Sequence, residues 1–350
     1  MSDNKIELLC IGNAMVDVFA PADSAWLKGL EITEPVQHIS QEQAGHMLSD
    51  LRGGNTDNLV FASGGAVSNV AKVASMLNTR AAFAGCVGRD DLAALFENEL
   101  RDADVIPFLT SSDESTGVCF VLDMDGETRI AASPGAALEF TEADIREDLI
   151  AGVDAVVLDG YMLDRRPLVQ GILRLASRHG IPIALDAASV FQIKEKTEAI
   201  LHYSRNYPLI VFMNADESIV FYNTIRKSSN VEEFTSEREK EAFILKEICP
   251  VLKLITEGDI FPVIVIKLGG RGAVVLAGGN IHRVGTFAII PRSTVGAGDA
   301  FCAAFLSAWI RGKPIRECAS LGNKVAREVL MVPGTHIKKE KLASFAKLLR

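Results

Sequence analysis

Apolar and polar positions alternate along this chain in blocks that predict strands and helices in turn. We predict strands at residues 7–11, 81–87, 155–158, 182–185, 209–213, 263–267 and 273–276, and most of them are continuous Val, Ile, Leu and Ala runs without polar alternation. Such runs are typical of strands that are buried on both faces of a mainly parallel sheet.

Stretches with helical spacing of apolar residues lie between these strands, at residues 66–77, 91–101, 166–179, 237–248, 300–311, 315–329 and 339–349. The alternating order predicts an α/β fold, in which a doubly wound, mainly parallel sheet is connected by right-handed crossovers. We expect one domain over residues 1–350.

Two segments interrupt this rhythm. Residues 117–132 contain Asp125-Gly126 between two β-rich runs, which predicts a hairpin. Residues 20–59 are mostly polar or mixed and separate the first strand from a glycine turn. The two segments predict a small β-rich lid, built from about residues 13–60 and 108–135 and inserted in the core. Ordinary surface loops are the alternative interpretation.

Composition and charge narrow the class of partner. The chain has 350 residues, 48% of them hydrophobic, and a formal net charge of -9. An acidic chain has no basic excess to neutralise phosphates, so we expect neither a nucleic acid nor a membrane surface as partner. No apolar run is long enough to span a bilayer and residues 1–7 are polar, so we expect a cytoplasmic protein that acts on a small molecule.

Cysteine and histidine usage points away from metal or disulfide chemistry. The six cysteines are scattered and mostly sit in apolar runs, which is typical of buried thiols. The six histidines form no paired motif, so we expect no zinc site.

The stretch STVGAGDAF carries the clearest chemistry. Gly296, Ala297 and Gly298 lead into an apolar helix that we expect to begin near Asp299. Small residues at a helix start let backbone N–H groups approach an anion. Asp299 is explained either as a capping acid or as a base that accepts the proton of an attacking hydroxyl during phosphoryl transfer.

Two further motifs precede it. In the first, Gly64 and Gly65 run into a helix that carries Asn69, an arrangement that suits a ligand site or an ordinary turn. In the second, Asp17 follows Gly12-Asn13 near the end of the first strand, where a carboxylate would accept hydrogen bonds from a polyol.

The chain resembles the ribokinase-like, or PfkB, carbohydrate and nucleoside kinases in four motifs that occur in the same order. They are GNAMVD, the glycine pair with Asn69, the turn at residues 88–91 and STVGAGDAF. The resemblance spans nearly the whole chain. It implies an α/β core with a small β-rich lid, ATP as phosphoryl donor and Mg²⁺.

The resemblance also implies roles for individual residues. Asp299 would be the catalytic base, with Gly296, Ala297 and Gly298 as the anion hole, and the acceptor would be held by Asp17, Asn13, Gly64, Gly65 and Asn69. Asn214 and Glu217 match an NxxE element that organises metal and phosphates, with Glu217 on the metal side. The nucleotide would lie beside Lys267, Gly269, Gly270, Gly272 and Asn323.

Departures from the family pattern leave several points open. Ser293 replaces the more usual Asp or Asn, so activation by a monovalent cation is open. Residues 185–189 lack the DxNxR pattern of many sugar kinases and look closer to adenosine-kinase-like members. Only 7% of the residues are aromatic, which disfavours a pocket that stacks a base. We expect an ATP-dependent sugar kinase, with a nucleoside kinase or a non-catalytic relative as alternatives. A homodimer through the lid is also left open.

Overall fold

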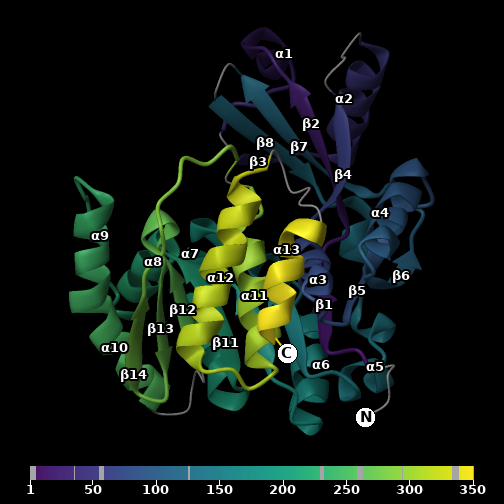
Figure 1. The fold of residues 1–350 in the computed structure, drawn as a ribbon. Helices are drawn as coiled ribbons and strands as arrows, with labels where there is room; N and C mark the ends of the chain where they lie inside the picture. Colours follow the sequence, from purple (N-terminus) through teal and green to yellow (C-terminus); the bar gives the residue numbers. More distant parts are fainter. Residues whose placement is uncertain are drawn as a thin grey trace.

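The computed structural model describes residues 5–34, 36–54, 59–124, 127–228, 232–257, 263–293, 295–332 and 339–349. Nine strands form a large sheet in the order β14-β13-β12-β11-β10-β9-β1-β5-β6 (Figure 1). Their neighbours pair in parallel, except that β13 and β14 are antiparallel. The bounds are β1 (Leu8–Ile11), β5 (Ala81–Val87), β6 (Ile106–Ser111), β9 (Ala155–Asp159), β10 (Ile183–Asp186), β11 (Leu209–Asn214), β12 (Val263–Lys267), β13 (Ala273–Ala277) and β14 (Asn280–Val284).

Helices cover both faces of this sheet, because each buried strand sends alternate side chains to opposite faces. Leu8 and Cys10 of β1 join one apolar cluster, whereas Leu9 and Ile11 join the other. The first cluster includes helices α3 (Ala66–Met76), α4 (Asp91–Asp102), α11 (Ala297–Trp309), α12 (Ile315–Leu330) and α13 (Lys339–Ala346). The second includes α6 (Arg166–Arg178), α7 (Val190–Asn206), α8 (Ala215–Ile225) and α10 (Cys249–Glu257).

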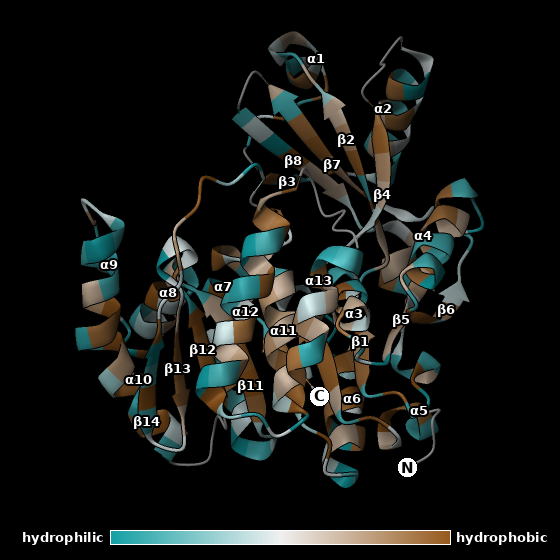
Figure 2. Cartoon of the chain, in the orientation of Figure 1, coloured by the Kyte–Doolittle hydropathy of each residue, from teal (hydrophilic) through white to brown (hydrophobic). Residues whose placement is uncertain are grey.

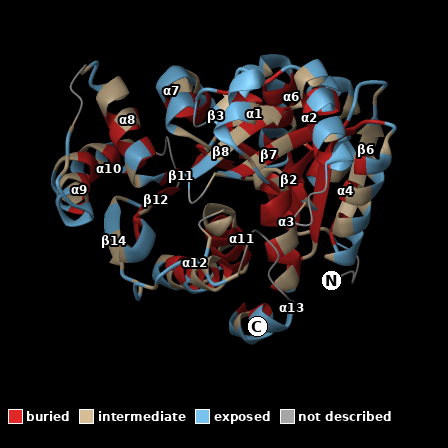
Figure 3. Ribbon diagram, turned by 90° about the horizontal axis from the view of Figure 1, so that it is seen from above, coloured by how far each residue is buried: buried red, intermediate tan, exposed pale blue. Residues whose placement is uncertain are grey.

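The figures show the resulting layers. Apolar strands lie between helices whose outward faces are hydrophilic (Figure 2). Seen from above, buried strands run between largely exposed outer helices (Figure 3). The doubly wound, mainly parallel α/β core expected from the sequence is confirmed.

A smaller sheet stands above one edge of the large one (Figure 1). Its strand order is β3-β8-β7-β2-β4, with β2 (Met15–Pro21), β3 (Val36–His38), β4 (Val60–Gly64), β7 (Gly117–Met124) and β8 (Glu127–Ser133). Val16, Val18 and Phe120 are buried with Leu27 of α1 (Ser24–Gly29) and Met47 of α2 (Gln41–Gly53). One face of the smaller sheet is therefore covered.

Several elements differ from expectation. The segment 20–59, expected to be a mixed insertion, contains α1, β3 and α2. β6 overlaps the stretch expected for the lid, yet it pairs with β5 in the large sheet. The expected helix 237–248 is α9 (Glu237–Phe243) followed by a π-helical turn, Ile244–Ile248, that leads into α10. The expected hairpin strands pair as β7 and β8, while Asp125-Gly126 lies outside the described residues.

All six cysteines are free, and five of them are buried. In the described ranges, no helix combines the length and apolar character needed to cross a membrane.

Candidate functional site

Polar residues gather where four neighbouring parallel strands end. The last residues of β9, β10, β11 and β12 are Asp159, Asp186, Asn214 and Lys267. The register sets Asp186 beside Asp159 and Asn214 beside Lys267. In doubly wound sheets the carboxyl ends of the strands form the ligand-binding edge, so this edge is the candidate site.

Lys267 and Asp186 form an ion pair at this edge. Lys267 Nζ lies 2.6 Å from Asp186 Oδ2, and the two side chains are only 15% and 11% exposed. Burial alone would lower the pKa of Lys267, but the charges of Asp186 and Glu217 outweigh it and the net change is upward. Lys267 is therefore protonated and positively charged beside the carboxylates of Asp186 and Glu217.

Asn214 and Glu217 form a capping box at the start of α8. The Asn214 side chain accepts from the Glu217 N–H at 2.9 Å, and both Glu217 carboxylate oxygens accept from Asn214, at 2.6 and 2.7 Å. Glu217 is buried, and burial together with Asp186 raises its pKa to about 7, although Lys267 opposes this.

The oxygens of Glu217 and Asn214 suit a hard cation for which other groups supply most of the ligands. In the parts of the chain that the structure describes, no three His, Cys, Asp or Glu side chains form a group able to hold a metal ion. Since the oxygens of Glu217 are already engaged by Asn214, this carboxylate would reach a cation through water. Mg²⁺ keeps several waters and binds through few protein ligands, so the residues present fit it.

Asp299 lies in the first turn of α11, opposite these strand ends. Gly296 caps the helix in the left-handed conformation, with φ 77°, so its lack of Cβ allows the turn. Asn69 Nδ2 of α3 donates to Asp299 Oδ2 at 3.0 Å. Burial raises the pKa of Asp299 to about 7, against the opposing effect of the Asn69 hydrogen bond.

The helix begins at Ala297, two residues earlier than expected, because Gly296 makes the turn alone. Ala297 and Gly298 therefore belong to the first helical turn, where backbone N–H groups have no partner within the helix. Lys267 Nζ would be 3.3 Å from a Cβ at Gly298. The cation and the free N–H groups thus border the same space, which favours an anion.

Asp17 occupies a different place from the one expected. It lies inside β2 of the smaller sheet, because β1 ends at Ile11 and a second strand begins at Met15. Asp17 is 7% exposed, and burial raises its pKa to about 6 while Lys72 opposes and Glu99 adds to the rise.

The two glycines make room for neighbouring groups. A Cβ at Gly64 would overlap the Asp17 carboxylate, so Gly64 is required by packing. Gly65 has φ 86°, and a Cβ there would lie 2.6 Å from the backbone oxygen of Asn13. The Asn13 side chain accepts from Arg165 Nη2 at 2.7 Å. Asp17, Asn13, Gly64 and Gly65 are thus brought together where the two sheets meet.

We expect Gly64→Ala to destabilise the fold by about 1–3 kcal/mol, since the added methyl must displace the Asp17 carboxylate or the strand. Chemical denaturation would measure the loss. Gly45→Ala is the matched control, because Gly45 is an exposed position inside α2 with open space around it, and there Ala should be neutral or slightly stabilising. Equal stability of the Gly64 variant would contradict the packing role.

The remaining expected residues lie around the turn after β12. Gly269 and Gly270 are exposed with space beside them, whereas a Cβ at Gly272 would overlap the backbone oxygen of Val284. Asn323 Nδ2 of α12 donates to the backbone oxygens of Val284 and Gly285 at 3.3 and 3.4 Å. Gly272 and Asn323 therefore hold this turn against β14.

Sequence reasoning missed three charged groups at the site. Asp159 and Asp186 each end a buried strand, a pattern visible in VVLDG and IALDA. Burial raises the pKa of Asp159 to about 6, and Arg165 opposes this. Arg165 also donates to the backbone oxygen of Ala137 at 2.6 Å, but its long-range contacts leave no sequence pattern.

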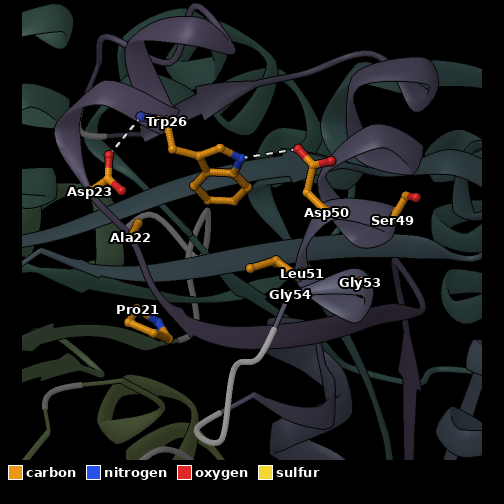
Figure 4. Close-up of a pocket in the computed structure, with 9 residues that line it drawn as sticks. All are labelled: Pro21, Ala22, Asp23, Trp26, Ser49, Asp50, Leu51, Gly53 and Gly54. Carbon is orange, nitrogen blue, oxygen red and sulfur yellow. Dashed lines mark hydrogen bonds between the residues drawn. The ribbon is translucent and has the colours of Figure 1, made fainter.

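A cavity of about 750 Å³ lies elsewhere, between α1 and α2 of the smaller sheet (Figure 4). Trp26 Nε1 donates to Asp50 there at 3.2 Å. None of the candidate residues lines this cavity, so it is separate from the site at the strand ends.

Comparison with known proteins places the chain in a family. The family described as pfkB family carbohydrate kinase matches residues 6–342. The chain is 25% identical to adenosine kinase of Schizophyllum commune over 95% of this chain and 97% of that protein. It is 26% identical to 5-dehydro-2-deoxygluconokinase of Bacillus anthracis, over 76% of this chain and 79% of that protein. The crystal structure of adenosine kinase from Sinorhizobium meliloti superposes with a TM-score of 0.80 and 25% identity, over 98% and 100% of the two chains. The chain belongs to the pfkB family of carbohydrate kinases.

Proposed function

We propose that this kinase transfers the γ-phosphoryl group of ATP to a hydroxyl of a small sugar or nucleoside, with Asp299 as the base. The observation that carries the proposal is the placement of Asp299. It lies in the first turn of α11, hydrogen-bonded to Asn69, beside the free N–H groups of that turn. A carboxylate with a pKa near 7 can take a proton at neutral pH, which suits general-base catalysis.

The other site residues would divide into two sets. Asp17 and Asn69 would hold the acceptor hydroxyls, since Asn69 Oδ1 is buried and has no hydrogen-bond partner among the residues that the structure describes. The N–H groups at Gly296, Ala297 and Gly298 would stabilise negative charge as the proton moves to Asp299. Lys267, which borders Gly298, adds a positive charge on the same side.

Mg²⁺ would be held by the ATP phosphates and, through water, by Glu217, and would neutralise phosphate charge. Asn214 would fix the Glu217 carboxylate for this task. The turn with Gly269, Gly270 and Gly272, braced by Asn323, would border the nucleotide. We propose that the smaller sheet is the lid that excludes water from the site. Monovalent-cation activation, a lid homodimer and a cytoplasmic location stay predictions.

Of the two acceptor classes, we favour a nucleoside. Asp17 shares its face of the smaller sheet with Phe19, Cys119, Val121 and Ile130, because these positions pair across β2, β7 and β8. All four side chains are partly exposed and apolar. An apolar stripe with one aromatic ring beside a hydroxyl-binding acid suits a base attached to a ribose. The similarity to adenosine kinases supports the same choice.

The sugar alternative is supported by the similarity to 5-dehydro-2-deoxygluconokinase. An ATP-dependent ADP-release screen across pentoses, hexoses, sugar phosphates and nucleosides separates the two. Turnover of a nucleoside alone supports our choice, and turnover of a sugar alone replaces it. Silence over the whole panel, with ATP binding intact, would favour a non-catalytic relative.

The pH profile tests the base. Ionised Asp299 is the active form, so kcat should fall as the pH drops below about 7. Asn69→Ala removes a hydrogen bond that lowers the pKa of Asp299, and the acid limb of kcat should therefore move to higher pH. Rates at saturating ATP and acceptor between pH 5 and 9 would measure this. An acid limb that stays fixed in the variant would argue against Asp299 as the titrating group.

A further inference from the structure

A buried polar cluster joins the smaller sheet to the large one. Ser63 precedes the two glycines and is fully buried at the end of β4. Its backbone N–H donates to Glu99 Oε2 at 2.6 Å. Its backbone oxygen accepts from Lys72 Nζ at 2.5 Å, and its hydroxyl contacts the same Nζ at 2.9 Å. Lys72 and Glu99 therefore hold both backbone polar groups of one residue.

The geometry ties this cluster to the site. Lys72 lies on α3, one helical turn beyond Asn69, and Glu99 lies on α4. Both helices cover the large sheet, whereas Ser63 pairs with Val16 of the smaller sheet, next to Asp17. The Lys72 and Glu99 side chains thus connect the helix that carries Asn69 to the strand pair that carries Asp17 and Gly64.

Electrostatic interactions also link Lys72 and Glu99 to Asp17. Burial raises the pKa of Asp17, Lys72 opposes the rise and Glu99 adds to it. Burial lowers the pKa of Lys72, against the charges of Glu99, Asp17 and Asp299. The Cys119 thiol, which pairs across from Asp17, has its own pKa raised by burial and by Asp17, so it stays neutral. Lys72 and Glu99 thus act on Asp17 with opposite sign.

We propose that Lys72 and Glu99 are a pair of positioning residues for the acceptor: they fix the Ser63-Gly64-Gly65 turn against the helix that carries Asn69. The inference rests on the proposed function only for the role of Asp17 in holding the acceptor. Neither side chain needs to touch the substrate, because both act through Ser63 and Asp17.

The test uses Lys72→Met, Lys72→Arg, Glu99→Gln and the Lys72→Met/Glu99→Gln double variant, with Lys339→Met as control. Lys339, the first residue of α13, forms an exposed ion pair with Asp104. The pKa of Asp17, followed by carboxyl ¹³C shifts and assigned with Asp17→Asn, should rise in Lys72→Met and fall in Glu99→Gln. The double variant should lie between them, and Lys72→Arg should stay near wild type. This readout needs no turnover.

Kinetics with adenosine and ATP give the second readout. Lys72→Met should raise KM for adenosine about tenfold or more while KM for ATP changes less than about twofold. The proposal would be overturned if the pKa of Asp17 moved in the same direction in Lys72→Met and Glu99→Gln. It would also be overturned if Lys72→Met unfolded at the wild-type temperature and changed KM for adenosine and for ATP equally. If the pKa of Asp17 moves in opposite directions in the two single variants but the wild-type protein turns over no acceptor, the positioning pair stands and the proposed function is removed instead.

Discussion

Asp299→Asn is expected to lower kcat by about 100-fold or more, while ATP binding stays within about threefold of wild type. The amide keeps the shape of the side chain but cannot take the proton of the acceptor hydroxyl, and general-base contributions are typically about 10²–10⁴-fold. The Asn69 hydrogen bond to the retained oxygen holds the side chain in place. Steady-state turnover and calorimetric titration with ATP would measure the two effects.

The matched control is Asp91→Asn. Asp91 is also an acid in the first turn of a helix, α4, but it is exposed and pairs with Arg52. If first-turn acids mattered here only through the helix dipole, both variants would lose a few tenths of a kcal/mol of stability and keep their activity. Near-wild-type turnover of Asp299→Asn would remove Asp299 from the mechanism.

Much of the fold follows from periodicity. The seven buried strands could be located because each is apolar on both faces, and 81–87 and 263–267 match the observed bounds. Helix α7 was not expected, since it buries the polar residues Gln192, Thr197 and Ser204 and so lacks a clear apolar stripe. The short β3 was also missed, because two of its three residues are exposed and it has no pattern of its own.

The site could be predicted only where local chemistry marks it. Gly296 and Asp299 stand out because small residues that lead into an acid at a predicted helix start are visible in the sequence, whereas the left-handed conformation of Gly296 is seen only in the structure. Asp186 and Arg165 were missed, since their roles depend on partners 81 and 152 positions away, Lys267 and Asn13. Gly64 was expected to approach a ligand, whereas the structure shows that its missing side chain accommodates Asp17. Pairings of this kind are set by topology and have no local pattern.

Lys267→Met is the second variant with a large expected effect, and it should lower kcat by about 100-fold. It removes the positive charge that borders Gly298 at the start of α11, and loss of one preformed electrostatic contact at such a site typically costs about 10²–10³-fold. It also leaves Asp186 without its buried partner, so the fold should lose about 3–5 kcal/mol. Turnover and denaturant unfolding would measure both losses.

The double variant Lys267→Met/Asp186→Asn separates the two roles of the lysine. Removing the carboxylate as well takes away the unpaired buried charge, so stability should recover, whereas turnover should stay low because the Lys267 charge that borders the start of α11 is still missing. Lys196→Met is the control for loss of a lysine charge, since Lys196 is 19% exposed but its partner Asp164 is 55% exposed and stays solvated when the lysine is removed. Recovery of turnover together with stability in the double variant would reduce Lys267 to a purely structural partner of Asp186. Persistent loss of turnover in a stable protein would place its charge in the phosphoryl-transfer step.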